Sequence, residues 1–396
     1  MLLESGRFLS NVGSASSAIA YPLLVYALTH SAVKMGIVAF VRGVPAPLLS
    51  LLAGIAADRG GRKRQMIAAD VVRAAAVGAL GMLVLLHHAR WWVIPVVAVV
   101  EAIGSTLFSA ASAGALRAVV PVQQLPAAIS ARTGRTSLTM MGGPPLGGAL
   151  FQLGRAVPFL TDAVSYVFSF VSLAAMRTPF QQQREPERAP ARVQLAEGFR
   201  YLWSRPFLRT CAFLYALGNP LMPAILLVLV FVGKRQGLTG GEIGLLSGAL
   251  GLAAFVGSLL ASTARRLLPI RSIMLLEFTT WFGAWVFVAW PNVFALLAVI
   301  VPFGLAAPIT DSVVDGYRLA MTPDRLLGRV ETARSTIALL ILPLGPLVAG
   351  VLLEHTSARV AVAAFAAFAL ALVVWGRASG ALRDAPSLDE LATLTA

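Results

Sequence analysis

Ionisable side chains lie inside several long apolar stretches of this sequence. Glu101 falls near the middle of one stretch, and Asp162 and Asp311 lie in two others. Arg42 lies some way into another stretch, nearer the N-terminus. A charged group surrounded by hydrocarbon is costly, so such residues usually face a cavity or a partner of opposite charge. The chemistry open to these carboxylates is to bind and release a proton, or to meet a cationic group.

Two interpretations of Glu101 remain open at this point. Desolvation favours the protonated acid and would allow proton exchange, whereas a static ion pair with Arg42 would hold the carboxylate ionised. We therefore take Glu101 as the first candidate for proton coupling, with Asp162 second and Asp311 third, and Arg42 as a charge in a cavity.

Other charged residues have a spacing that favours structural ion pairs. Asp311, Asp315 and Arg318 share one helical face, so they are expected to pair near the inner end of their stretch. Asp70 and Arg73 have the same spacing of three residues, and we expect a structural pair there too.

The composition excludes several other kinds of chemistry. The chain has one cysteine, Cys211, which rules out a disulfide within the chain, and it lacks the phosphate-loop, HExxH and GxSxG motifs. We therefore predict no enzyme, no catalytic residue, no cofactor and no resident metal. The net charge of +14 lies mostly in short segments between apolar stretches, which argues against a nucleic-acid partner.

Long apolar stretches dominate the chain. Of its 396 residues 58% are hydrophobic and 13% are charged, whereas a soluble domain has about 25% charged residues. Stretches of about 20 apolar residues read as membrane-spanning helices, because backbone groups in lipid must bond within their own helix. The sequence predicts an all-α membrane protein with twelve such helices: 7–29, 33–57, 66–87, 91–113, 126–152, 157–175, 207–232, 241–264, 270–289, 292–314, 328–354 and 358–376.

The two halves of the chain resemble each other at a constant offset of 202 residues. Gly143-Pro144 falls on Gly345-Pro346, and Pro121 falls on Pro323. Internal symmetry of this kind is expected of transporters. We predict an N-terminal six-helix bundle (1–176), a linker with an amphipathic helix (177–206), a C-terminal six-helix bundle (207–378) and a tail (379–396).

A motif rich in glycine and charge follows the second stretch: Gly54-Ile-Ala-Ala-Asp58-Arg59-Gly60-Gly61-Arg62-Lys63. It resembles the signature G-x-L-A-D-R-x-G-R-K of the major facilitator superfamily, with Ala56 in place of the usual Leu. The resemblance implies two pseudo-symmetric six-helix bundles that work by alternating access. It also implies a loop that controls conformational switching, with Asp58 close to residues 328–331; its residues are Gly54, Asp58, Arg59, Gly61, Arg62 and Lys63.

The fifth stretch contains GPPLGG, in which Gly143, Pro144, Gly147 and Gly148 resemble the GPxxGG motif of drug–proton antiporters. The match is partial, because the longer motif expects a glycine where this chain has Thr139. A purely structural role is the alternative, since small residues let helices approach closely.

Further phrases resemble the macrolide-efflux and siderophore-export branch of the superfamily, among them YPLLVYALTHSA (21–32) and PDRLLGR (323–329). The resemblance implies proton-coupled export of a small amphipathic or hydrophobic compound, such as an antibiotic or siderophore, and hence drug resistance. Nutrient uptake by the same fold, and a non-transporting membrane sensor or assembly protein, remain alternatives. We expect a monomer whose partners are the lipid bilayer, the cargo and protons.

Basic residues are distributed unevenly between the two sets of loops. With the N-terminus inside, twenty fall in inner loops and span ends, and six fall outside: Lys34, Arg90, Arg155, Lys234, Arg235 and Arg359. Because Lys and Arg are retained on the cytoplasmic side, we predict a cell-membrane protein with both termini and the linker in the cytoplasm.

This orientation is testable by cysteine labelling in a Cys211→Ala background. A membrane-impermeant thiol reagent on intact cells should label Lys234→Cys, in an outer loop, and leave Gln182→Cys, in the linker, unlabelled. Lysed cells supply the control, since both positions should then react. The opposite labelling pattern on intact cells would invert the topology.

Overall fold

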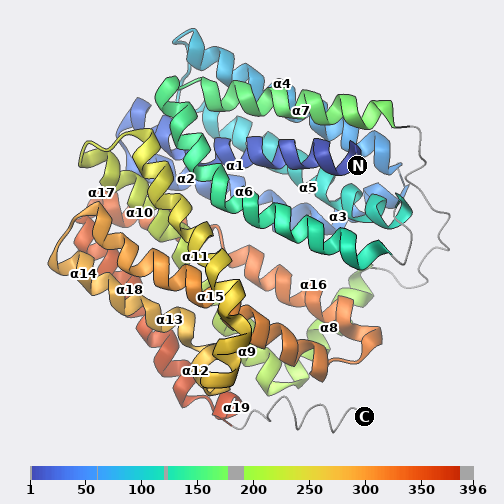
Figure 1. Ribbon diagram of the computed structural model, residues 1–396, viewed down its shortest axis with the longest axis vertical. Coiled ribbons are helices and arrows are strands. Elements are labelled where there is room, and N and C mark those ends of the chain that lie inside the picture. The colour runs from blue at the N-terminus through green and yellow to red at the C-terminus, as the bar shows by residue number, and fades with distance from the viewer. Residues whose placement is uncertain (1, 60, 120–123, 177–190, 384–396) are drawn as a thin grey trace. The chain divides into compact units, whose positions relative to one another are not determined.

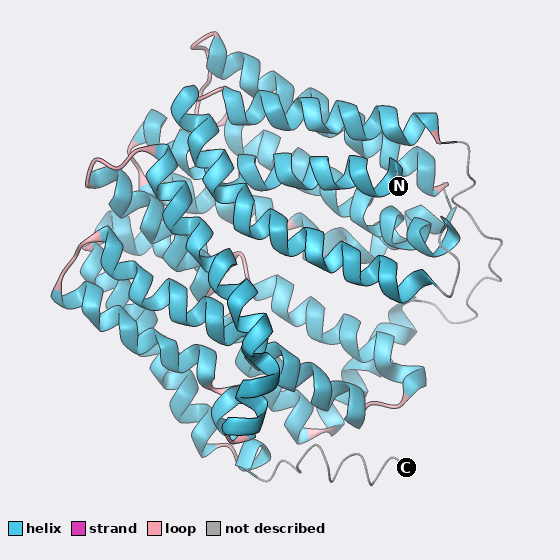
Figure 2. Cartoon of the chain, in the orientation of Figure 1, coloured by secondary structure: helices cyan, strands magenta, loops and turns pink. Residues whose placement is uncertain are grey.

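The computed structural model describes residues 2–59, 61–119, 124–176 and 191–383 (Figure 1). In these ranges the chain forms helices joined by short loops, with no strand (Figure 2). The all-α class predicted from the sequence is confirmed.

Contacts divide the chain into two units, Met1–Pro186 with Leu229–Gly251, and Glu187–Val228 with Leu252–Ala396. The domain boundaries at 176, 206 and 378 remain predictions. The first unit contains α1 (Leu2–Thr29), α2 (Ala32–Gly43), α3 (Pro45–Arg59), α4 (Arg62–Leu85), α5 (Val93–Val119), α6 (Leu125–Leu153) and α7 (Val157–Ala175). Helices α10 (Leu221–Arg235) and α11 (Gly240–Leu267) contribute residues to both units.

The second unit contains the remaining helices of the described chain. They are α8 (Ala191–Ser204), α9 (Pro206–Gly218), α12 (Ile270–Met274), α13 (Leu276–Thr279), η2 (Thr280–Gly283), α14 (Ala284–Ala289), η3 (Val293–Leu296), α15 (Leu297–Met321), α16 (Asp324–Ile341), α17 (Leu344–His355), α18 (Ala358–Ala378) and α19 (Gly380–Arg383). Helix α8 lies in the segment predicted to be a linker with an amphipathic helix, and that assignment stays a prediction; residues 177–190 of the segment lie outside the described ranges.

Ten helical segments of the described chain are long and apolar enough to cross a membrane, and they match ten of the twelve predicted stretches. The protein is therefore a multi-pass membrane protein. The fifth predicted stretch forms α6, whose 29 residues also have the length to cross. The ninth is not one helix: it divides into α12, α13, η2 and α14, of which Leu276–Ala289 is apolar but shorter.

Proline explains why other predicted spans are interrupted. Pro45 separates α2 from α3, Pro220 lies between α9 and α10, and Pro343 lies between α16 and α17. Proline has no amide hydrogen to donate to the carbonyl one turn earlier, and its ring clashes with that carbonyl, so a continuous helix bends or stops there.

Helix α1 lies at the centre of the first unit, where it packs against α6 and α7, while α4 packs against α5 and α7 (Figure 1). Gly13 permits the close approach of α1 to α7, because a side-chain carbon there would lie 2.8 Å from Asp162 Oδ1. The lack of a side chain at position 13 thus brings polar groups of two helices within hydrogen-bonding distance.

The GPPLGG segment of α6 presents a separate face to each of two helices. Gly143 and Gly147 face α1, where added side-chain carbons would overlap Ala15 and the Ser16 carbonyl. Pro144 and Gly148 face the part of α11 that belongs to the same unit, where they contact Gly244. Because residues four apart share a helix face, the G-P-x-x-G-G spacing gives α6 two smooth faces.

The second occurrence of the repeat makes an equivalent contact in the second unit. Gly345 packs so closely against the carbonyl of Pro220, between α9 and α10, that a side-chain carbon would overlap it. In each half, therefore, the glycine of the Gly-Pro pair packs against the first long span of that half.

Two glycines on α6 form a matched pair for testing this packing. We expect Gly147→Ala to lower the thermal unfolding temperature, because its methyl group meets the Ser16 carbonyl and lies 2.6 Å from Ile19 Cγ2. Overpacking of this kind costs about 1–3 kcal/mol. Gly142→Ala meets nothing within 4 Å, so alanine's better helix propensity, about 0.5–1 kcal/mol, should leave stability equal or higher. Equal shifts for both variants would contradict the packing.

Candidate functional site

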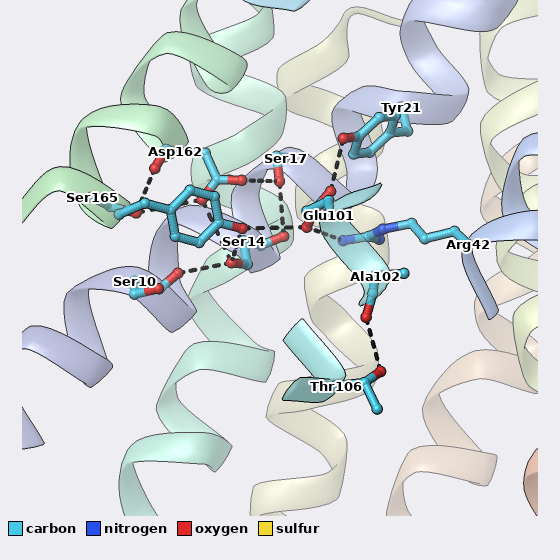
Figure 3. A network of polar contacts seen from close by, with 11 residues as sticks. Ser10, Ser14, Ser17, Tyr21, Arg42, Glu101, Ala102, Thr106, Asp162 and Ser165 are labelled. Carbon is cyan, nitrogen blue, oxygen red and sulfur yellow. Dashed lines mark hydrogen bonds and ion pairs between the residues drawn. The ribbon is translucent and has the colours of Figure 1, made fainter. Parts of the chain in front are cut away.

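Glu101, on α5, accepts hydrogen bonds from three side chains of the first unit (Figure 3). Tyr21 Oη on α1 donates at 2.7 Å and Arg42 Nη2 on α2 donates at 3.0 Å, while Tyr166 Oη on α7 lies at 3.4 Å. The residue is only 2% exposed. A guanidinium and two phenols together compensate the charge of the buried carboxylate.

Asp162, on α7, is fully buried and is surrounded by hydroxyl groups (Figure 3). Ser17 Oγ donates to it at 2.6 Å, and the hydroxyls of Ser14 and Ser165 lie at 3.5 and 3.4 Å. Within the described residues Asp162 makes no ion pair, unlike Glu101. Neutral donors stabilise a carboxylate less than a cation does.

A chain of hydroxyl groups connects the two carboxylates. Ser14 Oγ lies 2.8 Å from Tyr166 Oη, and these two hydroxyls bridge Asp162 at one end and Glu101 at the other. Each hydroxyl carries one hydrogen, so Ser14 donates at any moment to one of three acceptors: Asp162, Tyr166 or the Ser10 carbonyl oxygen at 2.9 Å. A proton can pass along this chain when each hydroxyl accepts one proton and gives up its own to the next oxygen, and rotation of the two hydroxyls then restores the starting arrangement.

Arg42 connects this buried network to a more open environment. Its side chain keeps 27% of its exposure, and the guanidinium lies 5.1 Å from the Tyr21 ring. The residue sits in the last turn of α2, directly before the interruption at Pro45. The ion pair that the sequence left open does form, and it ties the end of α2 to α5.

The predicted structural pairs also form, with one exception. Arg73 pairs with Asp70, and its guanidinium lies over the rings of Phe108 and Tyr166, at 4.8 and 4.2 Å. In the second unit, Arg318 pairs with Asp315 at 3.1 Å and with Glu331 on α16. Asp311, the third proton-coupling candidate, lies on α15 without joining this pair.

The structure describes part of the signature loop. Gly61 has φ +84°, a conformation that favours glycine, and it directly precedes α4. Lys63 Nζ donates to the carbonyl oxygens of Ala174 and Met176, at 3.2 and 2.5 Å, and so caps the end of α7. The sequence had not suggested this contact, although a cation is favoured at a helix C-terminus.

Other residues of the loop carry less structural information. A side-chain carbon at Gly54 would meet nothing within 4 Å, so close helix approach does not explain that glycine. The side chains of Asp58 and Arg59 lie outside the described part of the chain. A role for this loop in conformational switching stays a prediction.

Sequence reasoning missed the hydroxyl groups of the site. Ser10, Ser14, Ser17 and Tyr21 follow one another at intervals of four, three and four residues. That spacing places them on one face of α1, so a polar stripe on an apolar helix was the available signal.

Comparisons with known proteins agree with this architecture. The sequence profile of the Major Facilitator Superfamily matches residues 4–279. The multidrug efflux pump Tap of Mycolicibacterium fortuitum is 25% identical over 395 residues, covering 95% of this chain and 93% of that protein. The enterobactin exporter EntS of Shigella boydii is 24% identical over 340 residues, covering 82% and 78%. The crystal structure of the nucleoside transporter NupG has a TM-score of 0.74 at 13% identity, covering 97% and 99%.

Apolar helices that cross the membrane many times, with buried charges between them, define a polytopic membrane protein of the transporter class. The chain belongs to the Major Facilitator Superfamily, as the extent of the profile match establishes. The resemblance identified from the sequence motifs is confirmed.

The Arg42–Glu101 pair can be tested by single and double substitution. Removing one member of a fully buried pair costs about 3–5 kcal/mol, and the partial exposure of Arg42 should reduce that cost. We expect Glu101→Gln and Arg42→Gln each to lower the unfolding temperature and the yield of monodisperse protein. The double variant should recover much of the loss, and additive losses would show that the two residues do not act as a pair.

Proposed function

We propose that this protein exports small amphipathic or hydrophobic compounds across the cell membrane in exchange for protons, by alternating access. The observation that carries the proposal is the hydroxyl chain between two buried carboxylates, Asp162 and Glu101. Tap, a multidrug efflux pump, and EntS, an enterobactin exporter, support export over uptake.

The two carboxylates have unequal environments, which suggests unequal roles. Glu101 is compensated by Arg42, whereas Asp162 has hydroxyl donors only. Burial without a cationic partner favours the neutral acid. Asp162 therefore holds the proton in the resting protein. Glu101 receives a proton when Asp162 donates to Ser14, Ser14 gives up its own hydrogen to Tyr166, and Tyr166 gives up its own to Glu101.

Arrival of a proton at Glu101 has a mechanical consequence. A neutral carboxylic acid attracts a guanidinium much less than a carboxylate does, so Arg42 is released from α5. Because Arg42 lies at the end of α2 beside a proline interruption, its release frees a point at which the chain can bend. Proton binding thereby changes the geometry of the chain between α2 and α3. The signature loop contributes a second conformational switch.

The rival functions make different experimental predictions. Uptake by the same fold requires accumulation in the opposite direction. A sensor or assembly protein requires no proton movement in response to cargo. Both are distinguished from export by one assay in everted membrane vesicles, which are energised by an inward-acidic gradient.

We expect everted vesicles containing the protein to accumulate a fluorescent amphipathic drug and to release protons from the lumen as they do so. A pH-sensitive dye inside the vesicles measures the second quantity. Asp162→Asn should abolish drug-induced proton release while drug binding to the purified protein persists. Undiminished proton release in Asp162→Asn protein of verified fold would eliminate Asp162 as the carrier.

Two tyrosines provide a matched control for the proposed proton path. Tyr166→Phe and Tyr21→Phe each remove one hydroxyl that contacts Glu101, but only Tyr166 lies between the two carboxylates. Tyr166→Phe should slow proton release far more than Tyr21→Phe. Equal effects would mean that the hydroxyls only stabilise Glu101.

A further inference from the structure

Helix α8 is fixed in the second unit by one of its faces. That face packs against α16 (Figure 1). Gly198 lies so close to the carbonyl of Arg329 that a side-chain carbon would overlap it, and Glu197 forms an ion pair with the Arg329 side chain. Leu202, on the packed side, is only 2% exposed. The opposite face of α8 therefore has a defined orientation in the folded unit.

The opposite face of α8 carries aromatic and basic side chains. Trp203 is 59% exposed, and Arg200 is exposed as well. Together with Phe199 and Ser204 they line an open hollow of about 450 Å³. Arg209, in the first turn of α9, lies with its guanidinium 5.5 Å from the centre of the Trp203 ring and donates to the Trp203 carbonyl at 3.3 Å. Two cations and an indole thus lie at one concave surface.

The positive charge of this hollow is not balanced by carboxylates of the described chain. Glu197 is the one acidic residue of α8, and it is already paired with Arg329. Neither Arg200 nor Arg209 forms an ion pair with any residue that the structure describes. An anionic group from outside the protein would therefore complement the hollow, through charge-assisted hydrogen bonds to the two guanidinium groups.

The hollow lies where the chain enters the membrane. Helix α8 ends at Ser204, and the apolar segment Pro206–Arg235, which is long enough to cross a membrane, begins two residues later. The Trp203 ring packs edge-on against the ring of Phe213, with the ring centres 5.9 Å apart. Phe213 lies seven residues into that segment, roughly 10 Å along a helix. Because tryptophan favours the boundary between water and hydrocarbon, this contact indicates that the hollow lies at the level of the lipid headgroups.

Each feature of the hollow matches a different part of an anionic phospholipid. A guanidinium donates two parallel hydrogen bonds to a phosphate group, which it binds more specifically than an ammonium does. The rings of Trp203 and Phe199 match the glycerol region and the first carbons of the acyl chains. A soluble anion would use the charge and leave the aromatic surface in water, and a zwitterionic lipid brings its own cation. Basic pockets beside membrane-crossing helices bind anionic headgroups for these reasons.

We propose that the hollow at the α8–α9 corner binds the headgroup of an anionic phospholipid, with Arg200 and Arg209 on its phosphate and Trp203 against its glycerol and upper acyl chains. The site lies on the surface of the second unit and takes no part in the proposed proton path. The distribution of basic residues predicts that this corner faces the cytoplasmic leaflet, whose surface is negatively charged.

Native mass spectrometry of the full-length protein tests this site without any transport step. Phosphatidylglycerol or phosphatidylcholine is added to the detergent micelles, and the affinity of each bound lipid is measured. The wild type should bind at least one phosphatidylglycerol more tightly than phosphatidylcholine. Arg200→Gln should weaken that binding about fivefold, since one basic side chain near an anionic surface contributes about that factor. Trp203→Ala should weaken it too, because the aromatic contact with the lipid is lost.

A matched control separates this site from general surface charge. Arg266 is an exposed arginine in the last turn of α11, another helix long enough to cross the membrane, and Arg266→Gln should leave the affinity for phosphatidylglycerol unchanged. Arg209→Gln is an independent site variant and should weaken binding as Arg200→Gln does. Full affinity in both site variants, an equal loss in Arg266→Gln, or equal affinities of the wild type for the two lipids would overturn the proposal. Displacement of the lipid by inorganic phosphate would replace it with a site for a soluble anion.

Discussion

The cost of placing charge in a low-dielectric interior governs the arrangement of polar residues in this protein. Glu101 is compensated by a guanidinium and two phenols. Asp162 is held by neutral hydroxyls, and Glu277 has no compensating partner within the described chain. The three residues form a series of decreasing compensation. Along that series, less of the stability of the charged form comes from the protein itself.

Helix interruptions lie close to two charged groups in the interior of the helices. Arg42 ends α2 just before Pro45, and Glu277 lies just beyond the break at Leu275. A regular helix satisfies its own backbone and transmits little of a local electrostatic change. Next to an interruption, the same change acts on a segment that already departs from ideal geometry and can move at low cost. A change of charge at such a residue can therefore alter the local helix geometry directly, without a chain of intermediate contacts.

The sequence predicted the class of fold, most of the membrane-crossing segments and the family, because hydropathy and motif spacing are local properties. The Arg42–Glu101 contact remained one of two interpretations, since pairing across fifty-nine positions depends on how α2 and α5 pack. The hydroxyl stripe of α1 was readable from its spacing, but its connection to Asp162 required Gly13 to bring α1 against α7. The ninth stretch contains no proline, and Gly283 is the one weak helix breaker in the segment that forms η2, so the sequence offers little sign of the interruption.

The two faces of α6 have a consequence for motion as well as for proximity. In most helix pairs, ridges of side chains on one helix pack into grooves on the other. Sliding one helix along the other therefore forces side chains past each other, which costs energy. Where Gly148 meets Gly240 and Gly244, the facing surfaces consist largely of backbone, so no side chains have to separate there. Such a contact holds two helices at a small, fixed separation and presents few side-chain barriers to sliding along their axes.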